Sequence, residues 1–185
     1  MKTVRQCFYA HQGRYLDKWD HYFDIYERYF AQYVGKSVRL LEIGVSHGGS
    51  LQLWKSYFGP QAQIVGVDID PKCREYVEDQ IDIRIFDQAN PAIAGLGSFD
   101  IVIDDGSHRK SDQEASFKAL WPSTRGIFIV EDCHHTYPDI TVTDGFLVPY
   151  PWVLVALRPR RLIRGTPSRE LNEAEREAVS LYSHA

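Results

Sequence analysis

The sequence predicts an α/β fold built on a doubly wound, mostly parallel β-sheet. Five short runs rich in β-branched residues would form its strands, at 38–45, 63–70, 81–87, 99–106 and 126–133. The runs are continuously apolar rather than alternating, which is typical of strands covered on both faces. Each run ends in or next to an acidic residue, so carboxylates should gather at one edge of the sheet.

Three helical segments, 50–58, 71–79 and 110–121, are predicted between these strands. Ser50 is a candidate N-cap for the first, and Pro71 suits the first turn of the second. Because strands and helices alternate, we expect right-handed crossovers and a Rossmann-like arrangement, in which ligands bind beyond the carboxyl ends of the strands.

Residues 19–34 carry the strongest helical pattern in the chain. Aromatic and aliphatic side chains recur there at i, i+3, i+4 and i+7 spacing, from Trp19 to Val34. This spacing predicts an amphipathic helix whose aromatic stripe lies in the core, with Gly35 ending the helix.

The pattern weakens after residue 133. Segment 134–151 has three prolines and no helical period, so a loop is predicted in place of the next crossover. Beyond it, 152–159 and 160–167 are predicted as an antiparallel pair of closing strands joined by a tight turn, and 170–181 as a short charged helix.

Composition narrows the classes of partner. The chain has 185 residues, 44% of them hydrophobic, and a net charge of −4, which fits one domain without the basic surface that nucleic acid requires. Its three cysteines are scattered, which disfavours a disulfide framework or a thiolate zinc site and favours the reducing cytoplasm. No run is long enough to span a membrane, and a homo-oligomer remains possible.

The first candidate site follows the first strand, in LLEIGVSHGGS. A strand that enters a glycine-rich turn and then a helix lets the backbone approach a ligand closely. The spacing is not G-x-G-x-x-G, because Ser46 stands where a middle glycine would be, between Gly44 and Gly48. Glu42 at the strand end would repel a pyrophosphate and favours a cationic or zwitterionic ligand.

Asp68 ends the second predicted strand and can accept both hydroxyls of a ribose. Together with Glu42 and the glycine turn, it predicts a site for S-adenosylmethionine, a nucleoside that also carries an ammonium and a sulfonium. Asp87 and Gln88, at the end of the third strand, are candidates for contact with the adenine edge. The alternative is a turn that requires glycine for structural reasons only.

The second candidate site follows the fourth and fifth strands, in IDDGSH and IVEDC. Asp105, Glu131 and Asp132 are hard oxygen ligands, and three crowded carboxylates would repel one another without a cation. They predict a Mg²⁺ site whose open positions suit two adjacent hydroxyls of a substrate. His108 lies in the same turn and is the candidate general base.

Simpler interpretations remain open for these residues. Asp104 is a candidate cofactor contact, but it and Ser107 could instead bond the backbone at a strand end. His134 and His135 could hold zinc with a carboxylate, although the helical spacing and thiolates of common zinc sites are absent. His47 is expected to be a turn residue at the mouth of the cofactor site.

These motifs resemble the metal-dependent sugar O-methyltransferases of antibiotic biosynthesis, of the macrocin and mycinamicin type. The similar stretch covers roughly residues 15–137, and IDDGSH followed by VED is its most specific part. The resemblance implies a class I methyltransferase fold, with Mg²⁺ on Asp105, Glu131 and Asp132 and with His108 as base. It also implies cofactor contacts at Glu42, Gly44, Ser46, Gly48, Ser50, Asp68 and Gln88.

The resulting hypothesis is an S-adenosylmethionine- and Mg²⁺-dependent O-methyltransferase acting on a small-molecule hydroxyl, with a sugar or glycosylated natural product as the expected acceptor. It treats 1–185 as one methyltransferase domain: a helical segment (1–37) covering the cofactor side, a nucleotide-binding core (38–133) and a closing region (134–185). Two alternatives are an NAD-linked dehydrogenase, disfavoured by the missing G-x-G-x-x-G, and a cofactor-binding module without catalysis.

Overall fold

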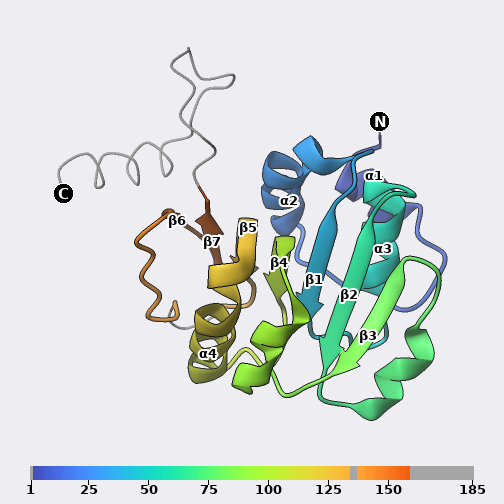
Figure 1. Cartoon of the computed structure of the whole chain (residues 1–185). Helices are drawn as coiled ribbons and strands as arrows, with labels where there is room; N and C mark the ends of the chain where they lie inside the picture. The colour runs from blue at the N-terminus through green and yellow to red at the C-terminus, as the bar shows by residue number, and fades with distance from the viewer. Residues whose placement is uncertain (1, 134–136, 159–185) are drawn as a thin grey trace.

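The computed structural model describes residues 2–133 and 137–158. Seven strands form one sheet in the order β3-β2-β1-β4-β5-β7-β6 (Figure 1). The first five strands pair in parallel, whereas β7 is antiparallel to β5 and β6 is antiparallel to β7. The predicted mostly parallel sheet with an antiparallel strand pair is therefore confirmed. The strands are β1 Arg39–Ile43, β2 Gln63–Asp68, β3 Ile81–Ile85, β4 Phe99–Asp104, β5 Thr124–Val130, β6 Phe146–Tyr150 and β7 Val153–Leu157.

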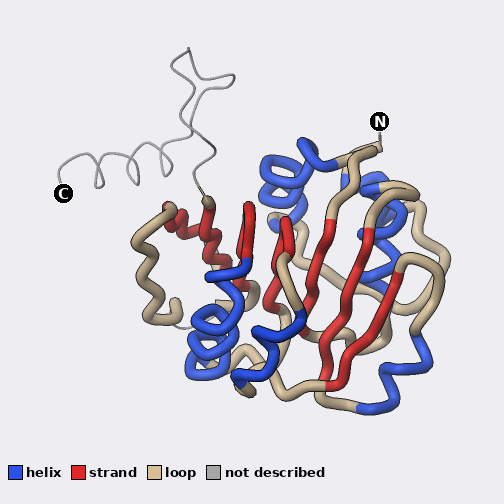
Figure 2. Tube along the Cα trace, in the orientation of Figure 1, coloured by secondary structure: helices blue, strands red, loops and turns tan. Residues whose placement is uncertain are grey.

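Helices cover both faces of the sheet, which forms the middle layer (Figure 2). Alternate residues of one strand belong to different buried clusters: Ile101 and Ile103 of β4 pack on one side, and Val102 packs on the other. This alternation explains the continuous apolar runs of the sequence. The first side is covered by α1 Val4–Tyr9, α2 Tyr22–Phe30 and α3 Gly49–Phe58, and the second by α4 Lys110–Leu120 and the 3₁₀ segment η3 Pro91–Leu96.

The predicted helix at 19–34 is shorter in the structure. It comprises α2 and the 3₁₀ turn η1 Ala31–Tyr33, and Trp19 lies before α2 with 48% of its surface exposed. The aromatic stripe of α2 is buried as predicted, but residues 19–21 precede the helix, and Tyr33 and Val34 are only half-buried. The periodic pattern extended to Trp19 because spacing alone does not mark where a helix begins.

Two crossovers also differ from their predictions. Residues predicted as helix at 71–79 form the 3₁₀ helix η2 Pro71–Tyr76, and a short 3₁₀ turn, η4 Trp121–Ser123, follows α4. The N-cap of α3 is Gly48, in the left-handed conformation, rather than Ser50. Ser50 instead donates its hydroxyl hydrogen to Glu42, at 2.9 Å.

In the closing strand pair, β7 pairs with a different segment from the predicted one. Part of the predicted loop, β6, pairs with β7 through a two-residue turn at 151–152. Its prolines masked this strand, and Pro149 is tolerated because β6 is the edge strand of the sheet. The predicted strand 160–167 and helix 170–181 lie outside the described residues. None of the helices in the described ranges is long and apolar enough to cross a bilayer.

Candidate active site

A cavity of about 840 Å³ lies at the carboxyl ends of β1, β2, β4 and β5. The strand order reverses there between β1 and β4, which is where doubly wound sheets bind ligands. The volume is within the usual range for small-molecule sites. Of the predicted site residues, those lining the cavity are Gly44, Ser46, Asp68, Asp87, Gln88, Asp105, His108, Glu131 and Asp132.

Gly44 occupies the point where the turn after β1 meets the end of β4. Its φ is +92°, and a Cβ at this position would lie 2.0 Å from the main-chain oxygen of Asp105. Any other residue would therefore push the two strand ends apart. The glycine that sequence reasoning assigned to close ligand approach also permits close approach of the protein's own backbone.

Asp68 is held in place by three backbone amides. Its Oδ2 accepts from the N–H of Val45 at 2.8 Å and of Ser46 at 3.1 Å, and its Oδ1 accepts from Asp70 at 2.9 Å. A carboxylate has about four acceptor positions, so one remains for a ligand hydroxyl. The next residue, Ile69, also lines the cavity and is 68% exposed, which provides an apolar wall that sequence reasoning missed.

Gln88 and Asp104 support the turn after β4. The Gln88 amide donates to both carboxylate oxygens of Asp104, at 3.1 and 3.2 Å, and its Oε1 accepts from Ser107 N at 2.7 Å. Asp104 is fully buried, also accepts from Ser116, and does not line the cavity. Burial raises its pKa to about 6, partly offset by the bond from Ser116. The placement of Asp104 matches the alternative in which it stabilises the strand end.

Glu42, Gly48 and Ser50 do not line the cavity either. Glu42 is fully buried, and its Oε2 accepts from Ser50 and from the indole of Trp54. Its Oε1 has no hydrogen-bond donor among the described residues but lies 3.7 Å from the Lys18 ammonium. Burial raises the pKa of Glu42 to about 7, with Lys18 opposing the shift. The cation predicted for Glu42 is thus present within the chain itself.

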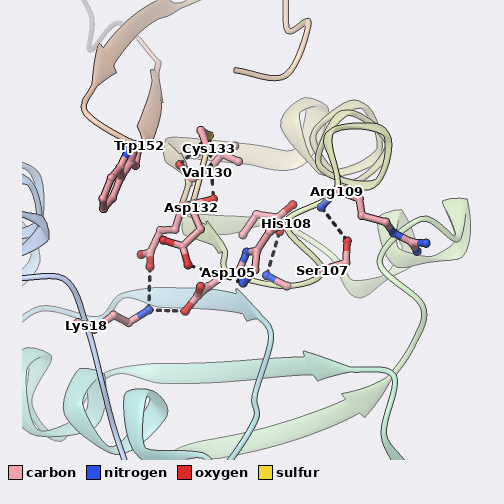
Figure 3. A network of polar contacts seen from close by, with 12 residues as sticks. Lys18, Asp105, Ser107, His108, Arg109, Val130, Asp132, Cys133 and Trp152 are labelled. Atoms are coloured by element: carbon pink, nitrogen blue, oxygen red, sulfur yellow. Dashed lines mark hydrogen bonds and ion pairs between the residues drawn. The ribbon is translucent and has the colours of Figure 1, made fainter. Parts of the chain in front are cut away.

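Lys18 joins both candidate sites. Its ammonium donates to Asp105 Oδ2 at 2.5 Å and to Glu131 Oε2 at 2.8 Å (Figure 3). Only 3% of its side chain is exposed. Burial alone would lower the Lys18 pKa, but attraction to Asp105 and Glu131 outweighs it and raises the pKa well above its ordinary value. Sequence reasoning missed Lys18, because a lysine before a helix carries no pattern that distinguishes it from a surface residue.

Asp105, His108 and Asp132 come together as a possible cation site. One ligand atom from each lies within 4.8 Å of the others. His108 Nε2 is 3.7 Å from Asp132 Oδ2. Two carboxylates and an imidazole at this spacing suit a divalent ion, and the carboxylates suit Mg²⁺. The turn after β4 and the end of β5 therefore meet as predicted, but the group contains His108, the predicted base, and not Glu131, the third predicted ligand.

Glu131 is buried beside this group and is bonded from two sides. Its Oε1 accepts from the Tyr26 hydroxyl at 2.5 Å, and its Oε2 accepts from Lys18. Burial raises its pKa, which Lys18 only partly offsets. The Tyr22 hydroxyl similarly donates to Asp132 Oδ1 at 2.6 Å. The aromatic stripe predicted as core thus also places two phenol groups on the carboxylates.

Strained backbone is concentrated around the cavity. The non-glycine residues with positive φ in the described ranges include Ser46, His108, Asp132 and Trp152, and the first three line the cavity. Such conformations are uncommon outside glycine and often mark functional positions. His134 and His135, the alternative zinc ligands, lie outside the described residues.

Comparison with known proteins places these observations in a family context, although no family model matches the chain. It is 40% identical over 141 residues to an 8-demethyl-8-(2-methoxy-α-L-rhamnosyl)-tetracenomycin-C 3'-O-methyltransferase of Streptomyces olivaceus, covering 65% of this chain and 35% of that protein. It is 39% identical over 143 residues to demethylmacrocin O-methyltransferase of Streptomyces fradiae, covering 68% and 36%.

Solved structures agree with this similarity. The MycE methyltransferase of the mycinamycin pathway, in complex with Mg, SAH and mycinamycin VI, superposes with a TM-score of 0.71 at 26% identity, covering 96% of this chain and 59% of that one. The chain spans about a third of the length of its curated relatives. The resemblance to sugar O-methyltransferases of antibiotic biosynthesis, and the class I methyltransferase fold that it implied, are confirmed.

Proposed function

We propose that the protein is an S-adenosylmethionine- and Mg²⁺-dependent O-methyltransferase that acts on a hydroxyl of a sugar or of a glycosylated small molecule. The observation that supports this most directly is the arrangement of one cavity. It has a glycine turn and Asp68 at one end and the group Asp105, His108 and Asp132 at the other.

The cofactor end fits a nucleoside with a charged tail. Asp68 retains one acceptor position for a ribose hydroxyl, Ile69 offers an apolar wall for the base, and Asp87 and Gln88 offer polar atoms beside it. We assign the main chain at Gly44 and Ser46 to contact with the methionine part. Glu42, Gly48 and Ser50 were predicted as cofactor contacts, but because they do not line the cavity, we propose instead that they support that turn. When bound, S-adenosylmethionine supplies an activated methyl group on a sulfonium.

Asp105 and Asp132 are the carboxylates that we assign to Mg²⁺. Glu131 remains the third proposed ligand, and it would exchange its bond with Lys18 for one with the ion. A bound divalent ion acidifies a hydroxyl coordinated to it. The Tyr22 hydroxyl holds Asp132 in orientation, and Tyr26 does the same for Glu131.

His108 is the proposed general base. It lines the cavity beside both carboxylates, and its positive φ of 58° directs the turn so that the imidazole reaches this end. Its role is to take the proton from the acceptor hydroxyl as the oxygen bonds to the methyl carbon and the carbon–sulfur bond breaks, which releases S-adenosylhomocysteine. The other contribution of the chain is alignment, because the transfer is an in-line displacement.

The names of the relatives support a sugar acceptor. Those from Streptomyces olivaceus and Micromonospora griseorubida are named for methylation of rhamnosyl-tetracenomycin and of mycinamicin VI. We extend this to a glycoside hydroxyl as the acceptor class. The cytoplasm is the proposed location, because the cysteines Cys7, Cys73 and Cys133 are free.

The test is transfer of labelled methyl groups from S-adenosylmethionine to a panel of glycosides, with Mg²⁺ or with EDTA. We expect Mg²⁺-dependent transfer in the wild-type chain. His108→Asn tolerates the positive φ and should reduce turnover by about 100-fold or more, with S-adenosylhomocysteine affinity unchanged. The matched control is His11→Asn, at a histidine that does not line the cavity, which should keep wild-type turnover.

The two alternatives give different results. S-adenosylhomocysteine binding without transfer to any acceptor would favour the binding module. Tight NADH binding without S-adenosylhomocysteine binding would favour the dehydrogenase, and either result would refute the proposal.

A further inference from the structure

Two exposed tryptophans lie beside the candidate active site. Trp19 and Trp152 pack edge to face, with ring centroids 5.0 Å apart and an interplanar angle of 70°. They are 48% and 38% exposed, whereas Trp54 and Trp121 are buried. Trp19 lines the same cavity as Asp105 and Asp132. Exposed aromatic pairs at a cavity are typical of ligand-binding surfaces.

The backbone turn that carries Trp152 is held next to the carboxylates. Trp152 forms the β6–β7 turn with a φ of +60°, a costly conformation for a bulky residue. Its carbonyl accepts from Cys133 N at 2.8 Å and lies 3.5 Å from the Tyr22 hydroxyl oxygen. Cys133 directly follows Asp132 in the chain, so its bond ties the turn to the cation site, and Figure 3 shows the indole on that side.

A ligand that binds between the two indoles and the carboxylates needs two kinds of surface. Its oxygens must face Asp105, His108 and Asp132, and an apolar part must face the indoles. A pyranose ring has both, because its hydroxyls project from the edge while C–H groups form an apolar face. Two indoles at 70° form a corner rather than a parallel slot, which suits a puckered ring better than a flat aromatic one.

We propose that Trp19 and Trp152 form the surface that binds the sugar ring of the acceptor, holding one hydroxyl edge toward Asp105 and Asp132. This inference rests on the proposed function and names the acceptor subsite within it. The two residues are binding residues that set specificity for a ring with an apolar C–H face.

The experiment measures binding of methyl α-L-rhamnopyranoside to the full chain by saturation-transfer NMR titration, with Mg²⁺ and S-adenosylhomocysteine present. Trp152→Asn removes the ring and tolerates the positive φ, and Trp19→Ala removes the other ring. Each should raise the dissociation constant about fivefold or more. Trp152→Tyr should restore part of the affinity. The control, Tyr9→Ala, removes a 73% exposed aromatic on α1 that does not line the cavity, and should change nothing.

Wild-type glycoside affinity in both tryptophan-loss variants would overturn the proposal, as would a wild-type chain that binds S-adenosylhomocysteine but no glycoside. Stronger binding of catechol than of the glycoside, with the same dependence on the two rings, would also overturn it in favour of an aromatic acceptor. Loss of glycoside binding in a variant counts as support only when thermal unfolding and S-adenosylhomocysteine affinity match the wild type. Glycoside binding through the tryptophans without S-adenosylhomocysteine binding would refute the proposed function and leave this inference standing.

Discussion

The two ends of the cavity are built in different ways. At the cofactor end, Asp68 is held by three backbone amides. Those of residues 45 and 46 belong to the turn after the neighbouring strand β1, and that of residue 70 belongs to the turn after β2. At the carboxylate end, Asp105, Glu131 and Asp132 depend on Lys18, Tyr22 and Tyr26, which lie 87 to 113 residues away in the chain. The comparison shows that one end is a local backbone structure, whereas the other exists only when the N-terminal segment is folded over the sheet.

The comparison predicts its largest effect at Lys18. Lys18→Met would leave Glu42, Asp105 and Glu131 without their buried cation and should lower the free energy of unfolding by about 3–5 kcal/mol. Mg²⁺ should restore part of the loss, because a divalent ion supplies positive charge to Asp105. Urea unfolding with and without Mg²⁺ measures both effects.

The matched control is Lys55→Met. Lys55 pairs with Glu78 at 3.1 Å, but its side chain is 29% exposed, so we expect a cost below about 1 kcal/mol. Equal costs for the two lysines would show that the carboxylate end does not depend on a buried cation.

The next effect is expected where the two ends touch. Gly44→Ala would place a Cβ against the Asp105 carbonyl at a positive φ, and should cost about 3 kcal/mol or more. It should also weaken binding of both S-adenosylhomocysteine and Mg²⁺, as measured by calorimetric titration. Gly35→Ala has a similar φ of +71° but open space, and should cost only about 1 kcal/mol. If Gly44→Ala weakened the binding of only one of the two ligands, Gly44 would not support both ends of the cavity.

The smallest effects are expected from variants that weaken the binding of one ligand and leave the other unchanged. Asp132→Asn, at a positive φ that asparagine tolerates, should weaken Mg²⁺ binding by about 100-fold and leave S-adenosylhomocysteine binding within twofold. Asp68→Asn should do the reverse, weakening S-adenosylhomocysteine by about 10-fold with Mg²⁺ unaffected. Titration of each variant with each ligand gives the four values. Equal losses of both ligands in both variants would show a single coupled site.

The sequence by itself determined the parallel strands of the sheet, the edge at which the cavity lies, and the carboxylates that meet there. Continuous apolar runs and the acidic residues that end them are local signals, and parallel strands bring their carboxyl ends together wherever they pair. The two main misassignments at the site also have local causes: Trp19 continued a helical pattern, and prolines concealed edge strand β6.

Only the tertiary structure decided which partners those carboxylates have. Lys18 has no local feature that separates a buried ammonium from a solvated one, and Trp152 became an exposed indole beside Tyr22 only through the β6–β7 pairing. The electrostatic energy of a charge and the exposure of an aromatic ring depend on the groups around them. Here those groups come from segments distant in the chain.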